Sequence, residues 1–99
     1  MKSIQLEADQ RQFILNAIQV VFPNVEIIIV GSRVRGEAKT YSDLDVALQG
    51  LKTLNPLQLL KLQEIFDESK LPFKVDVLDL RAVTDGFREH IEKTGERII

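Results

Sequence analysis

Cysteine is absent from the chain, so it can form neither a disulfide bond nor a thiolate metal site. The sequence also has no apolar run long enough to cross a bilayer and no signal-like apolar segment at its amino end. An excess of positive charge is missing as well, because 13 basic residues stand against 15 acidic ones for a net charge of −2. Nonspecific binding of nucleic acid requires that many phosphates be neutralised, so long RNA or DNA is an unfavourable partner. These absences lead us to expect a soluble cytoplasmic protein without disulfides.

Repeats, low-complexity tracts and linker-like segments are absent too. A chain of 99 residues is long enough for one hydrophobic core, so we expect residues 1–99 to form a single domain. That length leaves no room for both a catalytic half and a separate half that binds a second substrate. We therefore expect another chain to supply part of the function.

Hydrophobic periodicity divides the chain into helices and strands. It predicts helices over about residues 7–21, 55–69 and 84–93, strands over 25–30, 43–48 and 73–80, and a short edge strand at 97–99. The first strand is apolar and mostly β-branched, which suits burial on both faces. In the second helix, Leu57 and Leu60 widen the apolar side, and we favour a broad core face over a partner surface. His90, the only histidine, is distant in sequence from the motifs below, so we favour a structural role for it.

A glycine-serine turn directly follows the first predicted strand. Gly31 permits a tight turn with the backbone close to a ligand, and Ser32 can cap a short helix through residue 36. The start of a helix offers free N–H groups to phosphate, and the Ser32 hydroxyl adds a donor. Arg33 and Arg35 place two cations within reach of a polyphosphate, where charge-assisted hydrogen bonds are strong. The segment predicts a phosphate-binding site.

Two carboxylates share one face of the next predicted strand. Asp43 and Asp45 are two positions apart and point the same way, whereas the apolar residues that alternate with them face the other side. Neighbouring carboxylates repel each other, and a cation between them relieves that repulsion. Mg²⁺ prefers oxygen ligands and is usually held by one or two carboxylates together with substrate phosphates. The pattern predicts magnesium bound together with a nucleotide.

A transfer reaction that uses two metal ions needs a further carboxylate, and the strand at 73–80 offers two candidates. Asp76 lies in mid-strand between two valines, where an acid is out of place without a partner. We choose Asp76 to complete the second metal site and to orient or deprotonate the incoming hydroxyl. Asp79 lies nearer the strand end and on the opposite face, and we expect it to be a solvated residue.

Together these residues resemble the minimal nucleotidyltransferases of the DNA polymerase beta-like superfamily. The shared pattern is Gly31-Ser32, ten residues, Asp43-Leu44-Asp45, and a later strand with Asp76 between valines. The resemblance implies an α/β (α+β) fold, in which a small mixed β-sheet is flanked by helices. It implies a site with two Mg²⁺ ions on Asp43, Asp45 and Asp76. The nucleotide-binding residues would be Gly31, Ser32, Arg33, Arg35 and Ser42.

The same resemblance implies transfer of a nucleoside monophosphate, commonly AMP from ATP, to a hydroxyl group. Related members act as antitoxins in two-gene modules and adenylylate a tyrosine of a helical toxin, so a separate helical partner protein is implied. Two alternatives stay open. One is a non-catalytic regulatory or antitoxin subunit, but a purely structural role gives no reason for three clustered acids. The other is a transferase for a small molecule such as an aminoglycoside, although such enzymes usually carry an additional helical domain for the acceptor.

Overall fold

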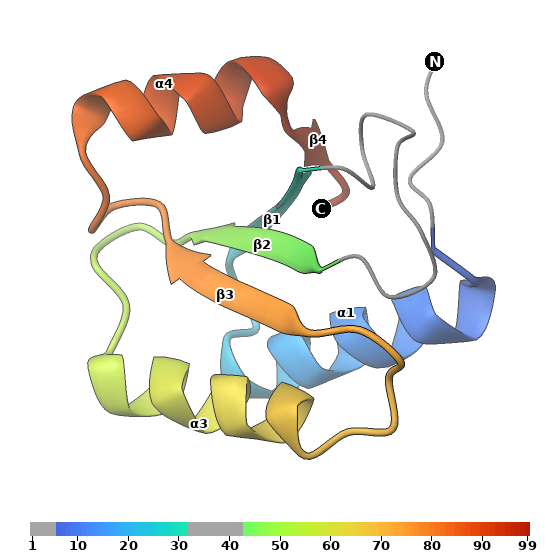
Figure 1. The fold of residues 1–99 in the computed structure, drawn as a ribbon. Coiled ribbons are helices and arrows are strands. Elements are labelled where there is room, and N and C mark those ends of the chain that lie inside the picture. The colour runs from blue at the N-terminus through green and yellow to red at the C-terminus, as the bar shows by residue number, and fades with distance from the viewer. Residues whose placement is uncertain (1–5, 32–42) are drawn as a thin grey trace.

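The computed structural model describes residues 6–31 and 43–99, which form a four-stranded sheet between helices (Figure 1). The strands lie in the order β3-β2-β1-β4; β1 is antiparallel to both of its neighbours, and β2 is parallel to β3. The elements along the chain are α1 (Ala8–Val21), β1 (Glu26–Val30), β2 (Leu44–Gln49), α3 (Pro56–Asp67), β3 (Val75–Asp79), α4 (Asp85–Thr94) and β4 (Glu96–Arg97). A mixed sheet flanked by helices confirms the predicted fold class.

The helices divide between the two faces of the sheet, with α1 and α3 on one face and α4 on the other (Figure 1). The alternation of side chains along β1 supplies both cores. Ile27 and Ile29 pack in the cluster with α1 and α3, whereas Ile28 and Val30 pack with Ile91 of α4. The central strand β1 is therefore buried on both faces, as its apolar sequence predicts.

Local sequence signals set the helix starts. The Asn55 side chain accepts hydrogen bonds from two backbone N–H groups in the first turn of α3, where Pro56 follows it. The Thr84 hydroxyl accepts a hydrogen bond from the Phe87 N–H at the start of α4. These side chains pair N–H groups that a helix start leaves free. The predicted starts of both helices are confirmed to within a residue or two.

The C-terminal residues form the predicted edge strand, which begins at Glu96, one residue earlier than expected. β4 pairs with β1, and the Ile98 N–H donates to the Ile27 oxygen at 2.9 Å beyond the formal strand end. An ion pair of 2.9 Å between Arg97 and Glu26 joins the same two strands. The C-terminus thereby completes the sheet beside β1.

The outer leucines of α3 lie outside the core. Leu62 and Phe66 face the sheet and are buried, but the side chains of Leu57 and Leu60 are 77% and 56% exposed. The broad core face that we favoured is wrong, because the helix buries only the stripe that faces the sheet and α1. Leu51 in the preceding turn is 95% exposed. Within residues 6–31 and 43–99, no helix has the length and hydropathy needed to span a membrane.

Candidate active site

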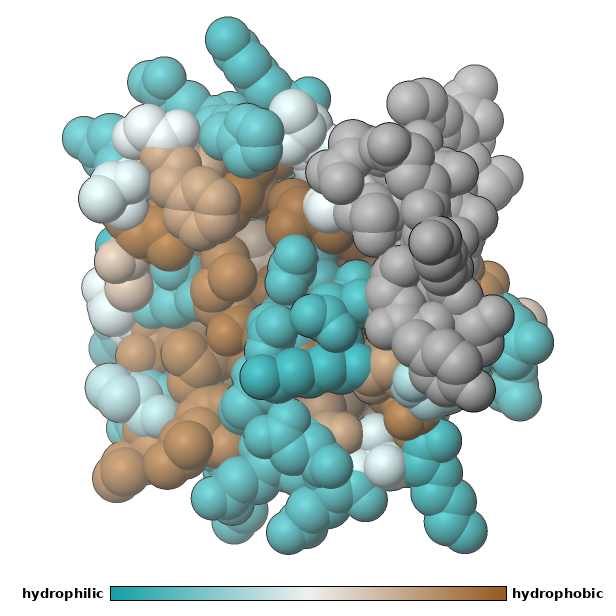
Figure 2. Space-filling model, viewed as in Figure 1, coloured by the Kyte–Doolittle hydropathy of each residue, from teal (hydrophilic) through white to brown (hydrophobic). Residues whose placement is uncertain are grey.

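Two of the predicted acids lie side by side on the face of the sheet that α4 partly covers. Asp45 of β2 is the register partner of Asp76 of β3, and two residues further along Ala47 pairs with Leu78 in the core beneath α4. Directly paired residues on adjacent strands project from the same face. Asp43, just before β2, is exposed. Figure 2 shows hydrophilic side chains gathered over β3 on this side of the molecule.

The electrostatics of Asp45 report this clustering. Partial burial raises the pKa of the Asp45 carboxyl above its ordinary value of 3.8, and the negative charges of Asp76 and Asp43 raise it further. Each of these causes disfavours the ionised form. A bound cation would reverse the effect by attracting all three carboxylates.

The turn after β1 approaches the same carboxylate. Gly31 has a φ of +93°, and it is the one residue of the described ranges with a positive φ. A Cβ atom placed on Gly31 would lie 3.2 Å from Asp45 Oδ2. The positive φ favours glycine, and the contact with Asp45 leaves little room for a side chain. Gly31, at the end of β1, therefore lies beside Asp45, the first metal-binding candidate of β2.

The rest of the predicted phosphate segment lies outside the described residues. This applies to Ser32, Arg33, Arg35 and Ser42, and to the short helix predicted through residue 36. Their assignment to the nucleotide stays a prediction. The described part of the candidate site consists of Gly31 and the three carboxylates.

A lysine that the sequence reasoning missed lies beside the third carboxylate. Lys74 Nζ is 3.4 Å from Asp76 Oδ1, and both side chains are partly exposed. The sequence does indicate this neighbour, because Lys74 is two residues before Asp76 and residues two apart on an extended chain share a face. Lys74 supplies positive charge to an acidic site and can move away from it, since its ammonium is held by this one ion pair among the described residues.

The outer edge of β3 is held by a glutamine of α3. Gln63 Nε2 donates to the Val75 oxygen at 2.7 Å, and the Val77 N–H donates to Gln63 Oε1 at 3.0 Å. These two backbone groups flank Asp76 on the side of β3 that faces away from β2. The Gln63 amide therefore forms hydrogen bonds with the edge of β3 as a neighbouring strand would, and it holds the backbone that carries Asp76 in place.

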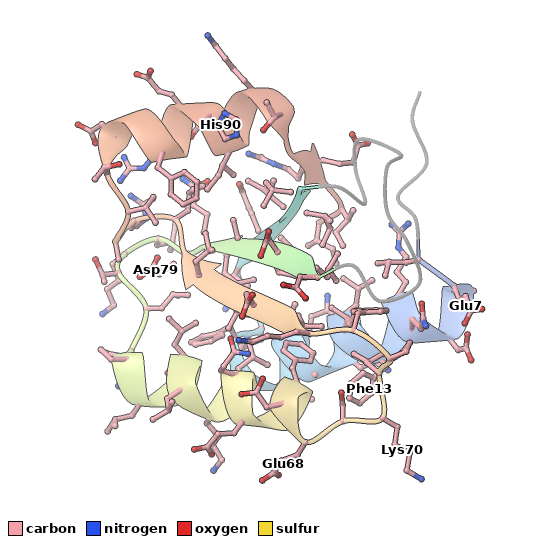
Figure 3. The ribbon with its side chains drawn as sticks, viewed as in Figure 1. Glu7, Phe13, Glu68, Lys70, Asp79 and His90 are labelled. Carbon is pink, nitrogen blue, oxygen red and sulfur yellow. The ribbon has the colours of Figure 1, made fainter. Side chains whose placement is uncertain are left out.

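Asp79 is not the solvated residue that we expected. Asp79 is only 4% exposed. Its two carboxylate oxygens accept hydrogen bonds from the Leu54 N–H at 2.8 Å and from the Arg81 N–H at 3.0 Å. Figure 3 shows Asp79 at the end of β3, beside the segment that leads into α3. The acid is buried because it pairs backbone donors from two turns. It is a structural residue on the face opposite the candidate site.

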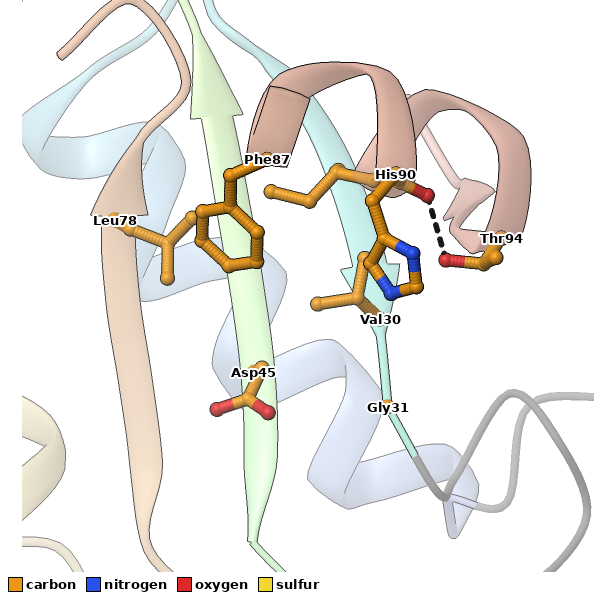
Figure 4. Close-up of a pocket in the computed structure, with 8 residues that line it drawn as sticks. Val30, Gly31, Asp45, Leu78, Phe87, His90 and Thr94 are labelled. Carbon is orange, nitrogen blue, oxygen red and sulfur yellow. Dashed lines mark hydrogen bonds between the residues drawn. The ribbon is translucent and has the colours of Figure 1, made fainter. Parts of the chain in front are cut away.

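A pocket of about 370 Å³ opens between α4 and the sheet, next to the carboxylates (Figure 4). Gly31 and Asp45 line it from the strands, and Phe87 and His90 line it from α4. His90 therefore lines one pocket with Gly31 and Asp45 despite its distance from them in sequence, and the structural role that we favoured for it stays a prediction. The sequence could have indicated this side of the pocket, because the helical spacing of Phe87, His90 and Thr94 places all three on one side of α4.

The donor atoms of this site suit magnesium. Oxygen ligands from Asp45 and Asp76 with Asp43 nearby match the preference of Mg²⁺. Burial raises the pKa of Asp45, and the negative charges of Asp76 and Asp43 add to that shift. Among residues 6–31 and 43–99, no group of three or more acidic or histidine side chains is arranged to hold a metal ion. Mg²⁺ usually fills its remaining positions with water and substrate phosphates. The arrangement fits an open site that a metal shares with a nucleotide.

Comparison with known proteins places the chain in a family. The family model described as "Polymerase beta, Nucleotidyltransferase" matches residues 9–99, so this chain belongs to that nucleotidyltransferase family. The chain is also 37% identical over 90 residues to the "Probable protein adenylyltransferase MntA" of Haemophilus influenzae. That match covers 91% of this chain and 79% of the relative. The resemblance proposed from the motifs is confirmed.

Solved structures share the fold. A toxin–antitoxin crystal structure with AMP-PNP aligns with a TM-score of 0.76 at 24% identity, over 89% of this chain and 71% of that chain. A complex described as tri-AMPylated Shewanella oneidensis HEPN toxin with MNT antitoxin aligns with a TM-score of 0.73 at 22% identity. It covers 95% of this chain and 72% of the solved chain. At these identities the likeness establishes the fold.

Proposed function

We propose that this nucleotidyltransferase moves AMP from ATP to a hydroxyl group on a separate helical protein, as the antitoxin of a two-gene module. The observation that carries the proposal is the direct register pairing of Asp45 with Asp76, with Gly31 against Asp45. The relative of 37% identity is described as a protein adenylyltransferase, which supports AMP as the group transferred and a protein as the acceptor. The complex of an AMPylated HEPN toxin with an MNT antitoxin supports a toxin as the partner.

The donor half of the site divides into two parts. Gly31 would bring backbone N–H groups to the triphosphate, together with Ser32, Arg33, Arg35 and Ser42. Asp43, Asp45 and Asp76 would hold two Mg²⁺ ions. When bound, Mg²⁺ supplies charge neutralisation of the phosphates and lowers the pKa of an acceptor hydroxyl.

The residues of the chain then orient an in-line displacement. The acceptor oxygen forms a bond to the α-phosphorus, the bond from that phosphorus to the bridging oxygen of the β-phosphate breaks, and pyrophosphate leaves with the electron pair. Asp76 would orient the acceptor and receive its proton. Lys74, which pairs with Asp76 at 3.4 Å, would be able to pair with a phosphate oxygen when that carboxylate holds a metal ion.

Exposed leucines near the start of α3 support a partner surface. Leu51, Leu57 and Leu60 leave large apolar side chains in solvent, where a monomer gains nothing from them. A helical partner would bury these side chains by packing against α3. A complex would also deliver an acceptor hydroxyl to the site.

The test combines the chain with the helical protein encoded beside it, Mg²⁺ and ATP labelled at the α-phosphate. We expect label on the partner with the wild type and none with Asp45→Asn or Asp76→Asn. Asp9→Asn in α1 is the matched control, because Asp9 is an exposed acid on the other side of the sheet. Label transfer at the wild-type rate by either site variant would refute the metal assignment. A stable complex without any transfer would instead favour a non-catalytic subunit, and modification of an aminoglycoside by the chain alone would favour a small-molecule transferase.

A further inference from the structure

The pocket between α4 and the sheet has two chemically different ends. Gly31 and Asp45 form the end that adjoins the proposed triphosphate and metal site. The opposite wall comes from α4, where the rings of Phe87 and His90 are nearly parallel, with an interplanar angle of 13° and centroids 6.5 Å apart. Figure 4 shows both side chains projecting from α4 toward the strands, on the same side as Asp45. The pocket therefore joins a phosphate site to an aromatic wall.

The aromatic wall is open to a ligand. Phe87 is 45% exposed although it stands beside the buried core residue Ile91. Leu78 and Val30 line the pocket from β3 and β1, so a flat ring against Phe87 would also contact aliphatic side chains. The Thr94 hydroxyl donates to the His90 oxygen at 2.7 Å within α4. A volume of about 370 Å³ is within the range of small-molecule sites.

The charges of the lining determine which part of a ligand it can hold. Among residues 6–31 and 43–99, no lysine or arginine lines the pocket, and the one carboxylate in its lining belongs to Asp45. A phosphate would be repelled there, whereas an uncharged planar ring would be favoured. Asp76, which we assign to the acceptor side of the reaction, is not part of the lining. The pocket therefore lies on the donor side of the metal site.

We propose that this pocket binds the nucleobase of the donor nucleotide, which stacks on Phe87 and His90 while its triphosphate extends to Gly31 and the carboxylates. The inference rests on the proposed function, because it takes a nucleoside triphosphate as the donor. It assigns a role to α4, which otherwise only covers the sheet. It also makes Phe87 a substrate-binding residue, since its ring contacts the base.

The test measures the affinity of the chain for two magnesium complexes, that of ATP and that of inorganic tripolyphosphate, which lacks the nucleoside. Stacking on an aromatic side chain contributes enough that Phe87→Ala should weaken ATP binding about tenfold. Binding of tripolyphosphate should not change. Phe87→Tyr, which keeps the ring, should bind ATP as the wild type does. Glu89→Ala is the matched control, because Glu89 is an exposed residue of α4 outside the pocket lining.

The outcomes separate this inference from the proposed function. Equal ATP affinity for the wild type and Phe87→Ala would overturn the base site, and so would equal losses of ATP and tripolyphosphate affinity. Unchanged ATP affinity with loss of transfer to the partner would overturn it as well, because the pocket would then serve the acceptor. A wild type that binds neither magnesium complex would refute the proposed function itself. His90→Ala provides a second variant on the same wall, with the same expected selectivity for ATP over tripolyphosphate.

Discussion

Replacing Gln63 by leucine should weaken the fold by removing the side chain that pairs the outer edge of β3. The change deletes the hydrogen bond from Nε2 to the Val75 oxygen at 2.7 Å and the one from the Val77 N–H to Oε1 at 3.0 Å. A hydrogen bond of this kind contributes about 0.5–1.5 kcal/mol net, so the two together contribute about 2 kcal/mol. Val75 is buried, which makes its unpaired carbonyl costly.

Thermal unfolding followed by circular dichroism measures this effect. For a domain of this size, 1 kcal/mol corresponds to about 4–8 °C in Tm, so Gln63→Leu should lower the Tm by about 10 °C. Gln58→Leu is the matched control: it makes the same chemical change on the same helix, and the Gln58 side chain is exposed. Gln63→Glu should be intermediate, because a carboxylate can accept from the Val77 N–H but cannot donate to the Val75 oxygen.

One result would refute the reasoning about this edge. If Gln63→Leu and Gln58→Leu unfold within about 2 °C of each other, the amide does not stabilise β3. The Gln63→Leu protein should also transfer AMP more slowly at temperatures where it is fully folded, because the backbone around Asp76 is less constrained. Wild-type transfer by that variant would show that Asp76 is positioned by the sheet alone.

Three further substitutions test the site and its supports. Asp45→Asn should lower the rate of AMP transfer by at least about 100-fold, because losing even a residue that only supports a metal ligand lowers activity about 10–100-fold. The same substitution should stabilise the metal-free fold at neutral pH. Because the pKa of Asp45 is raised in the folded protein, the stability of the wild type falls as the pH rises from 3.8 through the raised pKa. In urea unfolding, the difference in stability between Asp45→Asn and the wild type should therefore grow over this pH range, and it should be absent below pH 3.8. Gly95→Ala places a Cβ 2.5 Å from Ile28 Cγ2 and should cost about 1–3 kcal/mol of unfolding free energy, whereas an unchanged Tm would contradict that clash. Asp79→Ala leaves the N–H groups of Leu54 and Arg81 unpaired and should lower the free energy of unfolding by about 2–4 kcal/mol. A decrease of less than about 0.5 kcal/mol would contradict the structural role of Asp79.

The parts of the fold that short segments determine could be predicted from the sequence. The β-branched run of β1 indicated burial on both faces, and the parity of Asp43 and Asp45 put them on one face of a strand. Asn55 and Thr84 stabilise the helix starts at the predicted places because each pairs with backbone groups two or three residues away. These features depend on neighbours within one element, so the sequence alone contains the information.

The parts that depend on distant segments could not be predicted. Asp79 is buried because the Leu54 N–H, 25 residues earlier, reaches its carboxylate, and no local pattern reveals that contact. Gln63 looked like an ordinary polar residue until α3 lay along the edge of β3. His90 and Gly31 line the same pocket only because α4 folds back over the sheet. Leu57 and Leu60 misled because an apolar pattern does not distinguish a core face from an exposed one.

The most direct test of the central claim is the mass of the helical partner protein after incubation with this chain, Mg²⁺ and ATP. The account predicts that the partner gains the mass of one or more AMP groups with the wild type. It predicts no gain with Asp45→Asn, and a normal gain with Asp9→Asn. An unmodified partner in the presence of the folded wild type, or equal modification by wild type and Asp45→Asn, would contradict it.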